Sequence, residues 1–183
     1  MKDLREIYNF KVGDLRFRPI SEKDLEWARQ LHNDPEVISV LTDPHEISAE
    51  EQQRWYNKLK DSKSSLRIVV EKEERIGLIR IDDIDNYNFS LLLGLDITKE
   101  YRGKGLSKEI YNIMLKKIFC DHNMHRCWLM VADFNERAYG LYKKLGFIKE
   151  GRLKDRLYKG GKFHDYIVMR LLKSEWEKLY DTN

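Results

Sequence analysis

The stretch that decides the fold reads Tyr101-Arg102-Gly103-Lys104-Gly105-Leu106-Ser107. An apolar, strand-like segment from Phe89 to Ile97 precedes it. After it, an apolar residue recurs every fourth position, at Leu106, Ile110, Met114 and Ile118. This spacing predicts a helix with one apolar face. The stretch is therefore expected to join a buried strand to a helix.

The glycines of this junction suit an anion site. Gly103 and Gly105 place no side chain between the backbone and a ligand. The first turn of the next helix offers unpaired N–H donors at the positive end of its dipole. Such a junction can hold a phosphate or pyrophosphate, and Arg102 and Lys104 add positive charge. The same residues also suit an ordinary solvated turn. The stretch is neither a Walker loop nor the dinucleotide fingerprint, which need Gly-Lys-Ser/Thr and a third glycine.

The composition sets the broad class of protein. The chain has 183 residues, and 34 Lys and Arg nearly balance 31 Asp and Glu, for a net charge of +3. A nearly neutral chain gives no reason to expect a nucleic-acid partner. It has no apolar run near the roughly 20 residues that span a membrane, and its start lacks the apolar core of a signal peptide. We expect one cytoplasmic domain over residues 1–183, with a lead-in over residues 1–13 and no membrane partner.

Two cysteines and two histidines lie close together in the sequence, at Cys120, His122, His125 and Cys127. Zinc ligands normally come as spaced pairs from two segments, whereas a single helix-to-strand turn would have to supply these four. We expect no metal site and two buried structural thiols.

Strand and helix signals alternate along the rest of the chain. Expected strands cover residues 15–20, 66–71, 75–82, 88–97, 126–131, 147–158 and 162–172. Helices are expected after Ser21, after Ser48, at the glycine junction and after Asn135, with a long linker over about residues 35–47. This order predicts a single α/β (α+β) domain with a mixed central sheet of about six or seven strands and helices on both faces.

A second motif reads Asn135-Glu136-Arg137-Ala138-Tyr139-Gly140-Leu141-Tyr142-Lys143-Lys144-Leu145-Gly146-Phe147. Together with the glycine junction, it resembles the signature segments of the GNAT superfamily of acetyl-CoA-dependent N-acetyltransferases. The resemblance covers roughly Leu15 to Leu172. The ending, Glu150 to Tyr166, is similar to the branch of ribosomal-protein N-terminal and polyamine acetyltransferases. It implies a sheet that splays between the strand before the glycine loop and the following strand.

The resemblance also implies a binding site for acetyl-CoA. The family loop holds the CoA pyrophosphate, and it is matched here by Arg102, Gly103, Lys104, Gly105, Leu106 and Ser107. The splayed strand, around Leu95 and Ile97, would bond the pantetheine arm as an added strand would. Asn135 would reach the same arm, although it also suits a plain helix cap.

Tyr142 matches the family tyrosine that lies near the acetyl-CoA sulfur and protonates the departing thiolate. A positioned acid of this kind accelerates a reaction typically about 10²–10⁴-fold. The helical spacing of Tyr142 with Ala138 and Leu145 also suits core packing. The resemblance thus makes Tyr142 the candidate catalytic residue.

The general base stays open. Two positions depart from the family pattern. Ser107 stands where the loop usually has Gly or Ala, which concerns phosphate binding. Leu92 stands where many members carry a glutamate, which concerns the base. Leucine cannot take a proton, yet an amine with a pKa near 10 is almost fully protonated at pH 7. Water could carry the proton instead, and the other candidates are Asp96, Asp82, Asp83, Glu51 and His45.

The expected function is acetyl transfer from acetyl-CoA to a primary amine by direct attack, without a covalent enzyme intermediate. A protein N-terminus would need an open groove, a polyamine several carboxylates, and an amino sugar basic and aromatic residues. Four carboxylates favour a cationic amine, namely Asp34, Glu36, Asp43 and Glu46. Two short segments, residues 33–37 and 51–56, instead resemble the corresponding region of amino-sugar acetyltransferases.

Two other classes of protein compete with this enzyme. The leucine at the family glutamate position leaves room for a CoA-binding regulatory protein without turnover. A nucleic-acid-binding module would predict binding that weakens steeply with salt, and the near-neutral charge disfavours it. The family branch makes a homodimer plausible, although the sequence alone does not show one.

Overall fold

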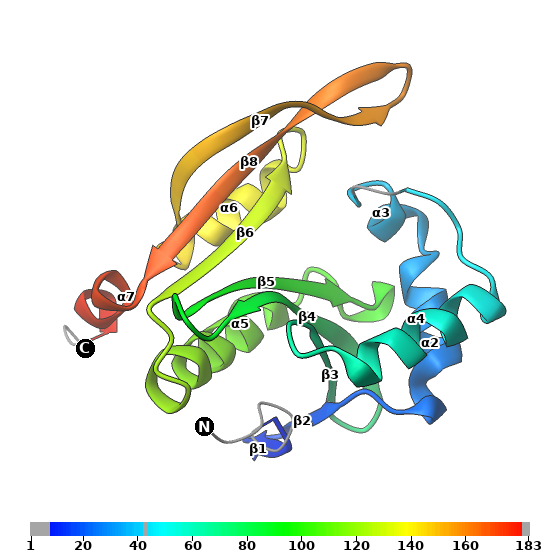
Figure 1. Cartoon of the computed structure of the whole chain (residues 1–183), viewed down its shortest axis with the longest axis horizontal. Coiled ribbons are helices and arrows are strands. Elements are labelled where there is room, and N and C mark those ends of the chain that lie inside the picture. The colour runs from blue at the N-terminus through cyan, green and yellow to red at the C-terminus, as the bar shows by residue number, and fades with distance from the viewer. Residues whose placement is uncertain (1–7, 42–43, 181–183) are drawn as a thin grey trace.

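The computed structural model describes residues 8–41 and 44–180, and these form one sheet with helices on both faces (Figure 1). The sheet has eight strands in the order β1-β2-β3-β4-β5-β6-β8-β7. Every neighbouring pair is antiparallel except β5 and β6. The strands are β1 (Phe10–Val12), β2 (Leu15–Pro19), β3 (Leu66–Glu71), β4 (Arg75–Asp85), β5 (Ser90–Ile97), β6 (Arg126–Ala132), β7 (Ile148–Lys159) and β8 (Lys162–Leu172).

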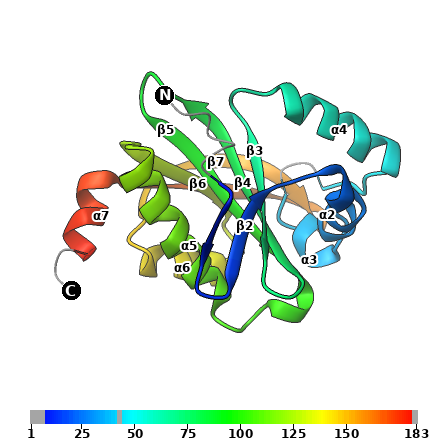
Figure 2. The ribbon, with the colours of Figure 1, turned by 90° about the horizontal axis from the view of Figure 1, so that it is seen from below.

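The helices divide between the two faces of the sheet, as Figure 2 shows. They are α2 (Leu25–His32), α3 (Pro35–Ile38), α4 (Ala49–Asp61), α5 (Leu106–Lys116), α6 (Glu136–Lys144) and α7 (Lys173–Tyr180). On one face, α2 and α4 pack over Val69 and Leu78. On the other face, Ile110 and Met114 of α5 belong to the larger cluster that contains Ile79. The mixed sheet with helices on both faces is therefore confirmed.

The parallel pair β5 and β6 opens into a splay. Their residues pair only from Ser90 to Leu92 and from Arg126 to Trp128. Beyond these positions β5 continues to Ile97 and β6 to Ala132, and the two strands diverge (Figure 1). The expected splay is confirmed. It leaves one edge of β5 without a strand partner directly before the glycine loop.

Three elements were not expected from the sequence. The eighth strand is β1, which lies inside the expected lead-in segment and pairs with β2. The linker contains α3, where Pro35 takes the first helical turn and the Asp34 carboxylate accepts a hydrogen bond from Glu36 N at 2.9 Å. After β8, α7 packs Trp176 against Phe119, with ring centroids 5.6 Å apart.

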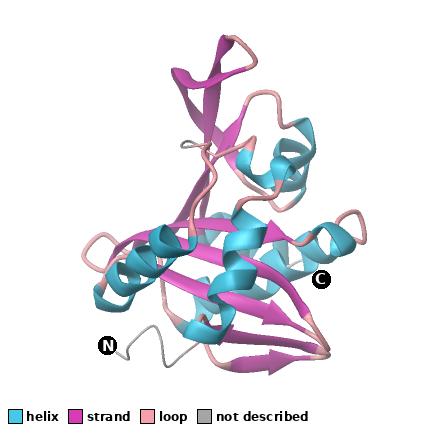
Figure 3. Ribbon diagram, turned by 90° about the vertical axis from the view of Figure 1, so that its right-hand side faces the viewer, coloured by secondary structure: helices cyan, strands magenta, loops and turns pink. Residues whose placement is uncertain are grey.

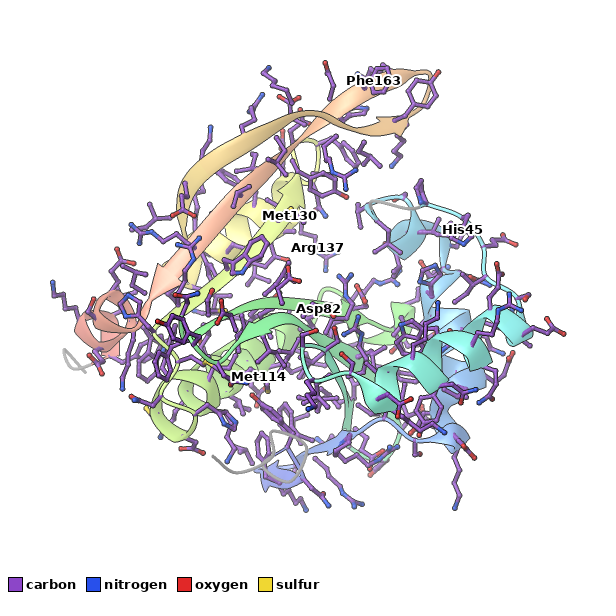
Figure 4. All side chains as sticks on the ribbon, in the orientation of Figure 1. His45, Asp82, Met114, Met130, Arg137 and Phe163 are labelled. Atoms are coloured by element: carbon purple, nitrogen blue, oxygen red, sulfur yellow. The ribbon has the colours of Figure 1, made fainter. Side chains whose placement is uncertain are left out.

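The hairpin of β7 and β8 rises beyond the rest of the molecule, as Figure 3 shows. Its tip exposes Phe163, which Figure 4 labels. Of the two cysteines, Cys127 is buried, and burial raises its pKa, but Cys120 is exposed. The expectation that both thiols are buried was wrong for Cys120, which lies in the last turn before the chain reaches β6. In the described part of the chain, no helix is long and apolar enough to span a membrane.

Candidate active site

The glycine loop adopts a backbone conformation that only glycine takes up readily. Gly103 and Gly105 have φ values of +79° and +80°, in the left-handed region. A Cβ atom built on either residue would meet nothing within 4 Å, so the space above the loop is open. Helix α5 begins directly afterwards at Leu106, and its first N–H groups have no partner within the helix. The loop therefore has the open backbone and the helix start that the predicted anion site requires.

The loop opens onto a cleft of about 620 Å³ between the splayed strands. The cleft contains nine of the ten residues predicted to bind acetyl-CoA; these are Leu95, Ile97, Arg102, Gly103, Gly105, Leu106, Ser107, Asn135 and Tyr142. The opposite wall is formed by α3 and the turn after it, through Val37 and Val40 among others. Lys104 does not line it: this residue is exposed, with its ammonium nitrogen 5.2 Å from the ring centre of Tyr101. The loop, the splayed strand and α6 thus meet in one place.

A pair of tyrosines lies at the inner end of this cleft. The hydroxyl of Tyr111, on α5, is 3.5 Å from that of Tyr142, on α6, and both residues line the cleft. Burial raises the pKa of both phenols, so both keep their protons at neutral pH. Tyr142 is therefore able to act as an acid. Tyr111 was missed in the sequence because it stands beside the apolar stripe of α5 and gives no signal of its own.

Arg102 links the glycine loop to α3. Its Nε donates a hydrogen bond to Ile97 O at 2.9 Å, and its Nη1 lies 3.2 Å from both Asp34 Oδ1 and Glu36 Oε2. Burial would raise the pKa of Asp34, but the hydrogen bond and charge of Arg102, together with the backbone hydrogen bonds from Glu36 and Val37, outweigh it and lower the pKa. The guanidinium therefore joins the glycine loop to the far wall of the cleft.

Asn135 has a structural role in addition to any contact with a ligand. Its Oδ1 accepts a hydrogen bond from Ala138 N at 3.1 Å, which caps α6. The capping role is confirmed. Arg137, two residues further along the chain, lies at the same cleft (Figure 4) and adds positive charge there.

A second pocket of about 280 Å³ lies between α2, α4 and the sheet, and it shares Asp96 with the cleft. Arg80 holds this carboxylate, with its Nε 3.0 Å from Asp96 Oδ2 and its Nη2 3.2 Å from Oδ1. Arg67 also lines the pocket and donates a hydrogen bond to Asp82 Oδ1 at 2.9 Å. The two cavities therefore meet at an ion pair.

Comparison with known proteins assigns the family. Residues 14–148, well over half of the chain, match the acetyltransferase (GNAT) domain. The chain belongs to the GNAT acetyltransferase family. It is 30% identical to the spermidine N(1)-acetyltransferase of Vibrio cholerae over 167 residues, which cover 90% of this chain and 96% of the relative. It is 32% identical over 101 residues to a putative ribosomal N-acetyltransferase of Bacillus subtilis, over 55% of each protein.

A solved structure has the same fold. The spermidine N-acetyltransferase of Vibrio cholerae in complex with CoA and spermine matches this GNAT chain with a TM-score of 0.83 and 30% identity. The match covers 89% of this chain and 98% of the other. The expected enzyme class, an acetyl-CoA-dependent N-acetyltransferase, is confirmed. Another structure of the Vibrio cholerae enzyme is a complex with manganese ions, so the expectation of no metal stays a prediction.

The structure of this acetyltransferase leaves the general base unassigned. Arg80 already holds Asp96, and Arg67 holds Asp82. Asp83 is exposed, and Glu51 accepts a hydrogen bond from Ser48 N at 2.8 Å as part of a helix cap. His45 lies on the outer loop before α4 (Figure 4). Asp43, one of the acidic residues noted above, lies outside the described residues. Water is therefore the simplest carrier of the amine's proton.

Proposed function

We propose that this acetyltransferase binds acetyl-CoA in the cleft and transfers the acetyl group to a small primary amine by direct attack. One observation carries the proposal: the glycine loop, the free edge of β5 and Tyr142 line a single cleft of about 620 Å³. The residues present fit the cosubstrate, because the loop offers open backbone donors and φ-positive glycines where a bulky side chain would fill the space.

The chain binds and orients the cosubstrate through its backbone. The loop from Arg102 to Ser107 and the first turn of α5 hold the pyrophosphate. The free edge of β5, around Leu95 and Ile97, bonds the pantetheine arm. A backbone N–H on this strand stabilises the negative charge that develops on the carbonyl oxygen. Bound acetyl-CoA supplies the thioester whose carbonyl carbon the amine attacks.

Tyr142 completes the proton balance of the reaction. The amine nitrogen forms a bond to the carbonyl carbon while the carbon–sulfur bond breaks. Water takes one proton from the ammonium group before the attack and a second from the nitrogen after the new bond has formed. Tyr142 gives its hydroxyl proton to the sulfur, and the phenolate that remains regains a proton from water, so that one proton is released for each acetyl group transferred. The raised pKa of Tyr142 supports this role, because the phenol stays protonated throughout the neutral pH range.

The names of the relatives point to two kinds of acceptor, spermidine and a ribosomal protein. Spermidine serves as the reference acceptor because the spermidine acetyltransferase matches 90% of this chain. The test measures thiol release from acetyl-CoA in the presence of spermidine, an N-terminal peptide and amino sugars. Thiol release that depends on one of these amines supports the proposal. Saturable acetyl-CoA binding without turnover of any of them would instead support a CoA-binding regulatory protein. A cytoplasmic location stays a prediction, and so does a homodimer, which light scattering would test.

A further inference from the structure

The second pocket has two neighbouring arginines in its wall. Arg67 on β3 lies directly opposite Arg80 on β4, and both line the pocket. Like charges directly opposite each other on neighbouring strands destabilise a sheet. Burial lowers the pKa of Arg67, and the charge of Arg80 lowers it further. Asp82 acts in the opposite direction. Each arginine is also ion-paired, Arg67 to Asp82 and Arg80 to Asp96, so the sheet holds both guanidinium groups in place at the wall of the pocket.

The backbone makes room for this pair. Gly94 on β5 is the cross-strand neighbour of Arg80. A Cβ atom at Gly94 would lie 3.0–3.2 Å from the guanidinium group of Arg80, closer than ordinary contact. The guanidinium therefore lies directly over Gly94, and a Cβ atom there would require it to shift by a few tenths of an ångström. Its side chain is 34% exposed, so it faces the pocket.

The pocket offers more donors than acceptors to a ligand. Each guanidinium carries five N–H donors. Among the described residues, the polar contacts involve Nη1 of Arg67 and Nε and Nη2 of Arg80. The described carboxylates that line the pocket are Asp96 and Glu51, and each already accepts a hydrogen bond from the protein. Ammonium groups would have to share Asp96 with Arg80 and Glu51 with the cap of α4, whereas ligand oxygens find guanidinium N–H donors.

Trp55 adds an aromatic wall. It lines the same pocket, and the guanidinium carbon of Arg67 lies 5.8 Å from its ring centre. Because Asp96 borders both cavities, an acceptor held here extends its amine towards the end of the cleft where Tyr142 lies. We propose that this pocket selects the acceptor, and that the acceptor is a primary amine on a small, hydroxyl-rich, anionic scaffold. This inference rests on the proposed acetyltransferase function. Phosphorylated and nucleoside-diphosphate-linked amino sugars are of this class, and linear polyamines are not.

The first experiment compares acceptors on the wild-type chain. The kcat/KM of acetyl transfer is measured for spermidine, glucosamine, glucosamine 6-phosphate and UDP-glucosamine. The proposal expects at least one of the two anionic amino sugars to exceed both spermidine and uncharged glucosamine by about 10-fold or more. A higher kcat/KM for spermidine would overturn the proposal while leaving the acetyltransferase function intact. Acetyl-CoA binding without transfer to any amine would overturn both.

The second experiment changes the pocket. Arg67→Gln removes one guanidinium, and Gly94→Ala displaces the other. Each is expected to raise the KM for the preferred anionic amine about 10- to 100-fold, with acetyl-CoA affinity unchanged and the KM for spermidine not raised. Arg16→Gln is the matched control, because this arginine is 54% exposed on β2 and pairs with Glu71. An unchanged KM in both pocket variants, with acetyl-CoA affinity intact, would overturn the proposal.

Discussion

The substitution Tyr142→Phe tests the proposed proton donor with the smallest possible change. It removes one hydroxyl group and keeps the ring, which packs 6.0 Å from the ring centre of Phe147. If Tyr142 protonates the leaving sulfur, kcat falls about 10²–10⁴-fold, the usual contribution of a positioned acid. Acetyl-CoA affinity stays nearly unchanged, because the loop and β5 make the main contacts. The Tyr111 hydroxyl loses its partner at 3.5 Å, so the free energy of unfolding falls by about 1 kcal/mol.

The assay combines steady-state thiol release with calorimetry and a pH profile. Because burial raises the pKa of Tyr142 above its ordinary value of 10.0, the wild-type rate is not limited by ionisation of this phenol below pH 10. Tyr111→Phe keeps the donor and is expected to lower stability far more than kcat. Tyr139→Phe, on the same helix but outside the cleft residues, is the matched control. A Tyr142→Phe enzyme with wild-type kcat would reduce Tyr142 to a packing residue.

Two further changes test the structure that supports the site. Asp24 is buried and ion-paired to Arg18 and Arg75, so Asp24→Ala should lower the free energy of unfolding by about 3–5 kcal/mol in urea titrations. Burial alone would raise the pKa of Asp24, but hydrogen bonds from Arg18 and Ser21 lower it. The stability that ionised Asp24 contributes is therefore present above about pH 4 and lost as the pH falls further. An Asp24→Ala variant that loses as much stability at low pH as at neutral pH would contradict this account. Tyr166→Phe removes the bond to Val40 O at 2.6 Å and should cost about 1 kcal/mol, whereas the same change at exposed Tyr158 should cost nothing.

The sequence predicted the cleft because its parts are local patterns. The glycine junction needs only a strand, a tight turn and a helix, and the Asn135 motif needs only a cap and an apolar stripe. Because β5 and β6 are parallel, their carboxyl ends lead in the same general direction and border one cleft after the strands diverge, so the two motifs meet there. The strands β3 and β8 follow the expected bounds for the same reason, since their apolar runs are bordered by charged or glycine-rich turns.

The second pocket could not be predicted in this way. Arg67 and Arg80 are thirteen positions apart, and only the register of β3 on β4 sets them opposite each other. Tyr111 depends on the angle between α5 and α6. Helix α3 was missed because Pro35 usually marks a break, whereas here it takes the first turn of a helix. These features depend on tertiary contacts between distant segments, for which a single sequence gives no periodic signal.

Acetyl-CoA binding is the measurement that tests the central claim most directly. Calorimetric titration of the wild-type chain should show saturable binding, and Gly105→Glu should abolish it, because a carboxylate would stand where the phosphates lie. Gly105→Asn separates charge from backbone strain, since asparagine tolerates the left-handed φ of +80° and should keep measurable affinity. A folded wild-type chain that does not bind acetyl-CoA, or a Gly105→Glu chain with unchanged affinity, would contradict the account of the cleft.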